Sequence, residues 1–304
     1  MKAGRERLTD VGEDALVEAL TRGLKPGKGV VVGVGDDCAV LRGGREGWYT
    51  LLKTDCVVEG VHYDAKAPPG RIGWKAIARS VSDVAAMGGE PRYALITLVM
   101  PGGEGVARVK AMYKGMEKAA QSFGLSIVGG ETSRVPGRGP VMISVAILGE
   151  VRKRRCALRS GGVAGDLLYV TGRLGGALAG RHLRFHPRLT EGRWLTEKFL
   201  IHAMMDLSDG LAKDLPRLAR SSRVGFELEL EAVPRSRGCD VKAALNDGED
   251  YELLFTVSPR SAGRLEEAWA SRFRDVRLTR IGRLLEDRSA GAGLKGGWDH
   301  FGRY

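Results

Sequence analysis

The residues with the clearest chemical potential are acidic side chains at the ends of apolar segments. Asp36 and Asp37 follow the apolar run 30–32, within the stretch 33–41. Two like charges about 5 Å apart repel by about 3 kcal/mol at an effective dielectric constant of about 20, so such a pair favours a bound cation. The same pattern recurs at Thr54-Asp55, Ser82-Asp83, Glu131-Thr132 and Asp206-Leu207-Ser208-Asp209. We interpret these distant acids as parts of one site that holds Mg²⁺ against phosphate groups.

Other kinds of reaction chemistry lack their signatures. The chain has no G-x-x-x-x-G-K-[ST] phosphate loop, no G-x-G-x-x-G at a strand-to-helix turn and no G-x-S-x-G elbow. None of its five histidines lies in a zinc-binding pattern. Hard oxygen ligands remain, and they suit phosphoryl transfer by metal clamping and positioning.

Each motif also has an ordinary interpretation. The Asp36-Asp37 pair could be a solvated turn, and Ser208 and Asp209 could cap a helix. Trp298 could be a packing residue and His62 a satisfied histidine, while Glu249 could belong to an acidic turn. The functional interpretation therefore depends on the motifs occurring together.

Composition indicates a globular protein of two domains. The chain has 304 residues, 43% of them hydrophobic and 28% charged, and a net charge of +11. The basic run 152–155 could attract phosphate-bearing partners or form a solvated surface. No apolar run is long enough for a membrane helix and residues 1–7 begin no signal core, so we expect a cytoplasmic protein without a membrane partner. The four cysteines form no C-x-x-C pair and are expected to be reduced.

Apolar periodicity predicts an α/β (α+β) protein in which Gly-rich turns at strand ends carry the acids. A domain boundary is expected in the charged and then Gly-rich stretch 150–165. The predicted helices cover 8–24, 72–87, 104–123, 174–183, 190–204, 211–221 and 262–273. The predicted strands cover 30–32, 48–54, 93–100, 125–128, 141–148, 167–171, 226–230, the end of 246–257, and 276–284. Leu16, Leu20 and Leu24 are expected to form the apolar face of the first helix.

Taken together, the motifs resemble the thiamine-monophosphate kinase family. This family belongs to the superfamily of aminoimidazole-ribotide synthetase, selenophosphate synthetase and the hydrogenase maturation dehydratase. The matching segments are G-V-G-D-D-C-A-V-L (33–41), T-D-C-V-V-E-G-V-H-Y (54–63), S-D-V-A-A-M-G (82–88), V-G-G-E-T (128–132), L-R-S-G (158–161), M-D-L-S-D-G-L (205–211), D-G-E-D-Y-E-L-L-F (247–255) and W-D-H-F (298–301). The resemblance implies a two-domain aminoimidazole-ribotide-synthetase-like fold with mixed sheets flanked by helices. Residues 1–150 would bind ATP and metal and form a homodimer, and residues 151–304 would contribute further ATP and substrate contacts.

The resemblance also implies an activity and a set of site residues. The activity is direct in-line transfer of the γ-phosphoryl group of ATP to thiamine monophosphate (TMP), with several Mg²⁺ ions and no phosphoenzyme. The implied metal ligands are Asp37, Thr54, Asp55, Asp83, Glu131, Asp206 and Asp209, with Lys53 a doubtful member. The implied ATP contacts are Gly130, Glu131, Arg159 and Ser208, and the implied TMP contacts are His62, Glu249 and Trp298.

Two positions depart from the family pattern. Glu131 replaces the usual Asp, which shifts the carboxylate by one methylene. Lys53 replaces a small hydroxyl residue, and its ammonium could replace or repel one metal ion. Three alternatives stay open: another ATP-using synthetase of the superfamily, a weakly active paralogue, and a non-enzymatic nucleic-acid binder. The last is disfavoured because basic residues interleaved with base-stacking aromatics are missing, so no nucleic-acid partner is expected.

Overall fold

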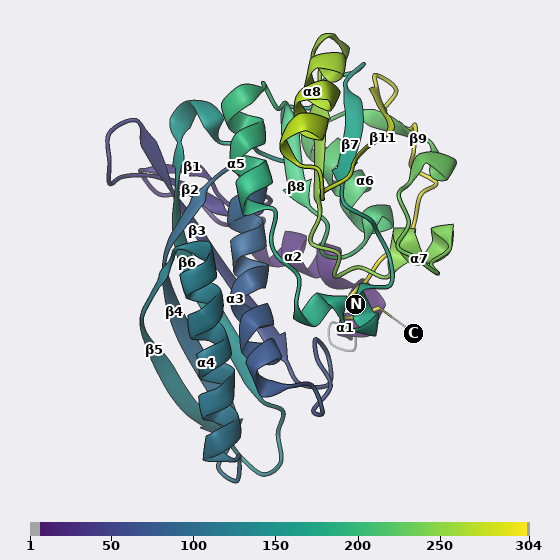
Figure 1. Cartoon of the computed structure of the whole chain (residues 1–304). Coiled ribbons are helices and arrows are strands. Elements are labelled where there is room, and N and C mark those ends of the chain that lie inside the picture. The colour runs from purple at the N-terminus through teal and green to yellow at the C-terminus, as the bar shows by residue number, and fades with distance from the viewer. Residues whose placement is uncertain (1–6, 303–304) are drawn as a thin grey trace, which may run out of the picture.

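Two β-sheets, each packed against helices, organise the protein (Figure 1). The structure is a computed structural model that describes residues 7–302. Residues 1–6, to which most of the expectation about a signal core refers, and residues 303–304 lie outside the described part. None of the helices within 7–302 has the length and apolarity needed to cross a membrane.

The first sheet has six strands in the order β1-β2-β3-β6-β4-β5. All neighbours pair antiparallel except β4 and β5, which are parallel because α4 connects them. The strands are β1 (Val30–Val32), β2 (Ala39–Arg42), β3 (Trp48–Val58), β4 (Glu90–Pro101), β5 (Ser126–Val135) and β6 (Met142–Arg152).

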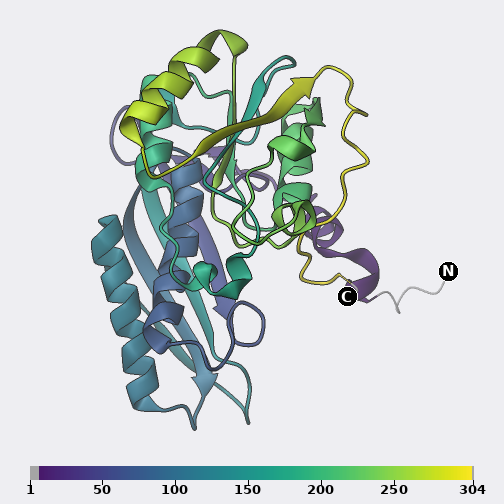
Figure 2. The ribbon, with the colours of Figure 1, turned by 45° about the vertical axis from the view of Figure 1, so that its right-hand side comes forward.

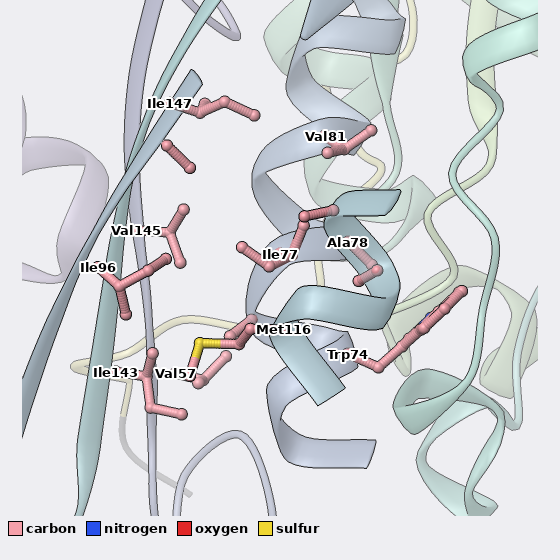
Figure 3. Packing of buried hydrophobic residues seen from close by; sticks show 14 of the residues in the cluster. Val57, Trp74, Ile77, Ala78, Val81, Ile96, Met116, Ile143, Val145 and Ile147 are labelled. Atoms are coloured by element: carbon pink, nitrogen blue, oxygen red, sulfur yellow. The ribbon is translucent and has the colours of Figure 1, made fainter. Parts of the chain in front are cut away.

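Two long helices cover one face of this sheet, α3 (Pro69–Ala86) and α4 (Val106–Phe123). Figure 3 shows Ile77 on the side of α3 that faces the sheet, whereas Trp74 lies on the side away from it. The two helices approach closely at Gly73 and Gly115: a Cβ on Gly73 would lie 1.9 Å from the carbonyl oxygen of Met112. Glycine is therefore required for this helix packing.

The second sheet has five antiparallel strands in the order β8-β10-β7-β11-β9. Helices cover both faces of this sheet, and alternate residues of each strand point into the two cores. Leu168 and Val170 belong to the core beneath α6, whereas Tyr169 packs in the core of α5 and α8. The elements are β7 (Leu167–Thr171), α5 (Leu189–Lys198), β8 (Ala203–Asp206), α6 (Leu211–Ser222), β9 (Gly225–Leu228), α7 (Val241–Asn246), β10 (Leu253–Val257), α8 (Pro259–Arg272) and β11 (Leu278–Leu285).

The expected helix over 8–24 is wrong as a single element. Gly12, with φ of +80°, separates α1 (Leu8–Val11) from α2 (Glu13–Thr21), and neither helix buries a residue. Leu20 is 69% exposed, so the leucines do not line a core. Instead α2 lies beside the second sheet unit (Figure 2), where Glu13 pairs with Lys213 at 2.9 Å. Charge pairing, not apolar burial, holds this helix.

Two further predicted helices are also wrong in part. Residues 174–183 form two short 3₁₀ turns, Ala177–Ala179 and Arg181–Leu183, because glycines at 175, 176 and 180 adopt positive φ and interrupt a helix. The helix expected over 190–204 ends at Lys198, and Ala203 and Met204 belong to β8.

Two predicted strands are longer than expected, which changes where their acids lie. β3 continues to Val58, so Thr54 and Asp55 lie inside the strand and not at its end. β5 continues to Val135 and is an exposed edge strand, not a short buried one. The other expected helices and strands are present, with ends shifted by a few residues.

Candidate active site

Three carboxylates from distant parts of the chain meet where the two sheet units join. Oxygen atoms of Asp37, Asp83 and Asp206 all lie within 4.8 Å of one another, and all three residues are buried. The turn between β1 and β2 supplies Asp37, α3 supplies Asp83, and Asp206 is the last residue of β8. The predicted convergence of these three acids is present.

Cationic side chains and a hydroxyl partly compensate the three acids. Arg159 donates to Asp37 Oδ1 from Nη2 at 2.5 Å and from Nε at 3.1 Å. Lys53 Nζ donates to Asp83 Oδ1 at 2.7 Å, and Ser82 Oγ donates to Asp206 Oδ2 at 2.6 Å. Burial, and next the neighbouring Asp37, raise the pKa of Asp206 to about 7. The cluster is thus electrostatically strained as it stands.

The donors in this cluster fit a divalent cation. Asp37 Oδ2 is buried and has no hydrogen-bond partner among the described residues, although a buried carboxylate oxygen normally has one. An Mg²⁺ ion would supply that partner, and Mg²⁺ prefers carboxylate oxygens. Asp37, Asp83 and Asp206 are the residues that would hold it.

Of the two expected metal ligands on β3, only Asp55 faces the carboxylate cluster. Asp55 lines the same cleft as Asp83 and Asp206, and its Oδ1 lies 3.3 Å from Arg79 Nη2. Thr54 is exposed and, by strand alternation, points to the opposite face of the sheet. Lys53 is the ion-pair partner of a carboxylate here, consistent with its doubtful place among the ligands.

Gly130 and Glu131 lie outside this cleft. The pairing of Asp55 with Val145, of Val145 with Ile96 and of Ile96 with Gly130 places Gly130 three strands from Asp55. At the usual strand spacing this is about 14 Å. Both residues are exposed on β5. Within one chain, the structure does not bring them to the carboxylate cluster.

Ser208 and Asp209 border the cleft at the start of α6. Neither caps the helix: the N-cap is Gly210, and Asp214 Oδ2 accepts from the backbone N–H groups of Ser208 at 3.1 Å and Asp209 at 3.0 Å. Asp209 also pairs with Arg217 at 2.6 Å. Charge-assisted bonds to Arg217 and Asp214 therefore hold this loop, and Ser208 and Asp209 line the cleft.

We call this cleft, with Lys53, Asp55, Asp83, Arg159 and Asp206 in its lining, the acidic cleft. A second hollow beside it contains the three predicted TMP contacts. His62, Glu249 and Trp298 line it together with Val61, Leu178 and His300, and we call it the aromatic pocket.

The aromatic pocket has a neutral histidine. His62 Nδ1 accepts a hydrogen bond from the backbone N–H of Val58 at 3.0 Å. Burial, followed by the nearby Arg79, lowers the pKa of His62 to about 3. Its ring is therefore uncharged at neutral pH.

Glu249 in the same pocket is an ionised carboxylate. It forms an ion pair with Lys75, and its Oε2 lies 3.4 Å from Nδ1 of His182. Burial alone would raise its pKa, but hydrogen bonding to His182 and the charge of Lys75 lower it to about 2. Glu249 also has a left-handed backbone, with φ of +58°. Such a conformation persists where surrounding contacts fix it, often at a binding site.

The acidic cleft and the aromatic pocket are adjacent. Four residues line both: Arg79, Ser208, Asp209 and His300. A molecule in the aromatic pocket could therefore extend a charged group toward the carboxylate cluster.

Sequence reasoning missed several residues that line the two hollows or contact their lining, namely Lys75, Arg79, His182, Tyr251 and His300. The available signal was on α3, where Lys75, Arg79 and Asp83 are spaced by four residues and so lie along one face of a helix that is otherwise buried. Charged residues at helical spacing inside an apolar pattern are expected only with partners.

Comparisons with known proteins identify the family. The models for AIR synthase related protein match this chain, the N-terminal domain at residues 35–151 and the C-terminal domain at residues 164–295. The thiamine-monophosphate kinase of Rhodopirellula baltica is 38% identical over 274 residues, covering 84% of each chain. The chain belongs to the thiamine-monophosphate kinase family. The member from Bacillus subtilis is 31% identical and covers 92% of this chain and 93% of its own.

Solved structures agree with this membership. One described as AaThiL complexed with AMPPCP and TMP is 33% identical, covers 98% of this chain and 100% of its own, and has a TM-score of 0.83. The HypE–HypF complex has a chain with a TM-score of 0.71 at 21% identity, covering 90% of this chain and 93% of its own, which shows a shared fold alone. The expected two-domain fold of the family is thereby confirmed.

Proposed function

We propose that this protein transfers the γ-phosphoryl group of ATP to thiamine monophosphate, forming thiamine diphosphate and ADP. The observation that carries this proposal is the adjacency of the acidic cleft and the aromatic pocket, which share four lining residues. The solved relative that holds an ATP analogue and TMP supports the same assignment.

The carboxylate cluster is the proposed Mg²⁺ site. Asp37, Asp83 and Asp206 would hold metal, and a bound Mg²⁺ would neutralise the phosphate oxygens of ATP. Asp55 and Asp209 line the same cleft and are proposed to complete the ligand set. Arg159, whose guanidinium already lies beside Asp37, is proposed to bind phosphate of ATP by its planar fork of donors.

The reaction needs little acid–base help from the protein. An anionic oxygen of the TMP phosphate forms the new bond to the γ-phosphorus of ATP, and the bond from that phosphorus to the β–γ bridging oxygen breaks in line. ADP leaves with the bonding electron pair. Because the attacking oxygen is already ionised at neutral pH, positioning and charge neutralisation are sufficient.

The aromatic pocket is proposed to bind the two rings of TMP. Ionised Glu249 can accept a hydrogen bond from the pyrimidine amine. Trp298 can stack against the cationic thiazolium ring. His62, being neutral, adds a polar contact without repelling this cation.

A homodimer is proposed from the uncovered face of the first sheet. Leu52, Tyr93, Leu95 and Val128 are 46%, 52%, 49% and 57% exposed there. An apolar sheet face of this kind is typical of an interaction surface. Glu131 lies in the edge strand of this sheet, so the contacts of Gly130 and Glu131 with ATP are proposed for the assembled protein. We propose residues 1–150 and 151–304 as the two domains, and a cytoplasmic location, which fits the four free cysteines.

The test is product formation by the purified protein. With ATP, Mg²⁺ and TMP we expect thiamine diphosphate and ADP in equal amounts, and none with EDTA or with thiamine in place of TMP. Asp206→Asn should lower the rate at least about a hundredfold, because it removes a proposed metal ligand. Release of free phosphate without thiamine diphosphate would instead indicate a synthetase of the same superfamily.

A further inference from the structure

Arg79 occupies the boundary between the acidic cleft and the aromatic pocket, and it lines both. It lies on α3 between Lys75, which contacts Glu249 of the aromatic pocket, and Asp83 of the carboxylate cluster. The spacing of four residues puts all three on one face of the helix. Arg79 is therefore placed between the proposed positions of the thiamine rings and of the nucleotide phosphates.

Existing contacts fix the guanidinium of Arg79 on one side. Its Nη1 donates to the backbone carbonyl of Cys56 at 3.0 Å, and its Nη2 lies 3.3 Å from Asp55 Oδ1. The side chain is only 12% exposed. Both partners lie on β3, so the strand holds the guanidinium in place before any ligand arrives.

The guanidinium also has unused capacity. Its Nε is buried and donates to no described residue. An unsatisfied buried donor costs about 1–3 kcal/mol, and more for a charged group. The hydroxyl of Tyr251, another residue of the acidic cleft, is likewise buried without a partner among the described residues. Water or the oxygen atoms of a ligand would supply the missing partners of these two groups.

A simpler role for Arg79 would be to neutralise Asp55. That role accounts for the contact of Nη2, but it does not account for the unsatisfied Nε or for the exposure of the side chain to both hollows. Phosphate matches the remaining donors, because its oxygens accept several charge-assisted bonds from a planar guanidinium.

We infer that Arg79 binds the phosphate of the acceptor and holds it beside the carboxylate cluster during phosphoryl transfer. This inference rests on the proposed function. The acceptor phosphate would be tethered at one end by the thiamine rings in the aromatic pocket and at the other by Arg79. Its attacking oxygen would then face the γ-phosphorus, while Arg79 keeps its proton and offsets the negative charge of the two phosphates.

The test compares two ligands that differ only in the phosphate. TMP and thiamine are titrated into the protein by calorimetry in EDTA, which removes any contribution of metal ions. We expect the wild-type protein to prefer TMP by about ten- to a hundredfold, the range of a charge-assisted contact. Arg79→Met should remove this preference and change thiamine affinity by less than about threefold, and Arg79→Lys should retain part of it.

Two further variants control the comparison. Arg79→Met leaves Asp55 without its cation, so Arg79→Met/Asp55→Asn, which removes both charges, tests the same preference in a compensated protein. Arg108 pairs with Glu59 and Glu104 and lines neither hollow, so Arg108→Met should keep the wild-type preference.

The outcomes separate this inference from the proposed function. Suppose that Arg79→Met and Arg79→Met/Asp55→Asn keep the wild-type preference for TMP over thiamine, while the wild-type protein forms thiamine diphosphate. Arg79 is then only a counter-cation for Asp55, and the proposed function stands. If the wild-type protein neither binds TMP nor forms thiamine diphosphate, the proposed function is wrong and the inference is overturned with it.

Discussion

Lys75 and Glu249 form an ion pair across the boundary between the two sheet units. Lys75, on α3, is 0% exposed, and its ammonium also donates to the backbone carbonyl of His62 at 2.6 Å. Burial lowers the pKa of Lys75 to about 8 against the opposing effect of Glu249, so both groups are charged at pH 7. One buried cation thus contacts two residues of the aromatic pocket.

Replacing Lys75 by methionine should strand the Glu249 carboxylate in the interior. Removing one partner of a buried ion pair typically costs about 3–5 kcal/mol, so the free energy of unfolding of Lys75→Met should fall by about that amount in urea titrations. Affinity for TMP should fall too, because Glu249 loses the contact that orients it.

The double variant Lys75→Met/Glu249→Gln controls for this effect. It removes both charges, so it should recover most of the stability but not the affinity for TMP. A Lys75→Met protein as stable as the wild type would show that the pair is not a desolvated charge pair.

Lys53 forms an ion pair with Asp83, which is a proposed metal ligand. The Lys53 ammonium lies 2.7 Å from Asp83 Oδ1. Burial lowers the pKa of Lys53, but the negative charge of Asp83 opposes burial, and the net effect of the neighbouring acids is to raise this pKa. Lys53→Ser should free that carboxylate and remove a like charge from the metal site, which raises Mg²⁺ or Mn²⁺ affinity about tenfold. Mn²⁺ titration followed by electron paramagnetic resonance measures this change.

Lys66→Ser is the matched control for Lys53, because Lys66 lies in an exposed loop outside the acidic cleft. Its Mn²⁺ affinity should equal that of the wild type. A decrease of affinity in Lys53→Ser would mean that the ammonium organises the ligands and does not oppose the metal.

The free energy of unfolding should depend on pH because folding lowers the pKa of His62. Its pKa is about 3 in the folded protein, mainly through burial, and about 6.5 in an unfolded chain. Between these values the unfolded chain binds more protons, so stability decreases as the pH falls below 6.5, by about 1.4 kcal/mol per pH unit from this group. Urea titrations of the wild type at pH 7, 6 and 5 should show this loss.

His62→Asn isolates the contribution of the imidazole, since an amide oxygen can still accept the hydrogen bond from Val58. The pH slope of its free energy of unfolding should be smaller than that of the wild type by the contribution of His62, about 1.4 kcal/mol per pH unit. Identical pH slopes for the two proteins would show that folding does not lower the pKa of His62.

The sequence predicts most elements here because their patterns are local. The apolar stripe of α3 and the alternation of β6 are visible without knowledge of the rest of the chain. The convergence of Asp37, Asp83 and Asp206 was predictable, because acids beside or within apolar segments are expected to be paired or bound to a cation. The position of Thr54, on the opposite face from Asp55, was not predicted, because the strand was expected to end at residue 54, whereas it continues to Val58 and its side chains alternate.

Lys75 and Arg79 were missed for a different physical reason. Charges on a helix are normally solvated, and this face of α3 is buried by segments that lie elsewhere in the sequence: Glu249 contacts Lys75, and β3 holds Arg79. Likewise, α2 has leucines at helical spacing, but its ion pairs with α6 decide its position. Tertiary contacts between distant segments decided each of these features.

The uncovered face of the first sheet predicts the oligomeric state. Tyr93 is 52% exposed in a row with Leu148 and Leu52, which pair across β4, β6 and β3. Tyr93→Asp would bury a carboxylate in an apolar interface. We therefore expect the dissociation constant of the proposed dimer to rise at least about a hundredfold. Light scattering coupled to size-exclusion chromatography measures the mass.

Leu200→Asp provides the control, because Leu200 is 74% exposed between α5 and β8 and away from this sheet. It should keep the mass of the wild type. If Tyr93→Asp also keeps a dimeric mass, this face is not the interface and another surface joins the subunits. If the monomeric Tyr93→Asp protein also loses ATP binding while its TMP affinity is kept, the contacts proposed for Gly130 and Glu131 require the assembled protein, because neither residue reaches the acidic cleft within one chain.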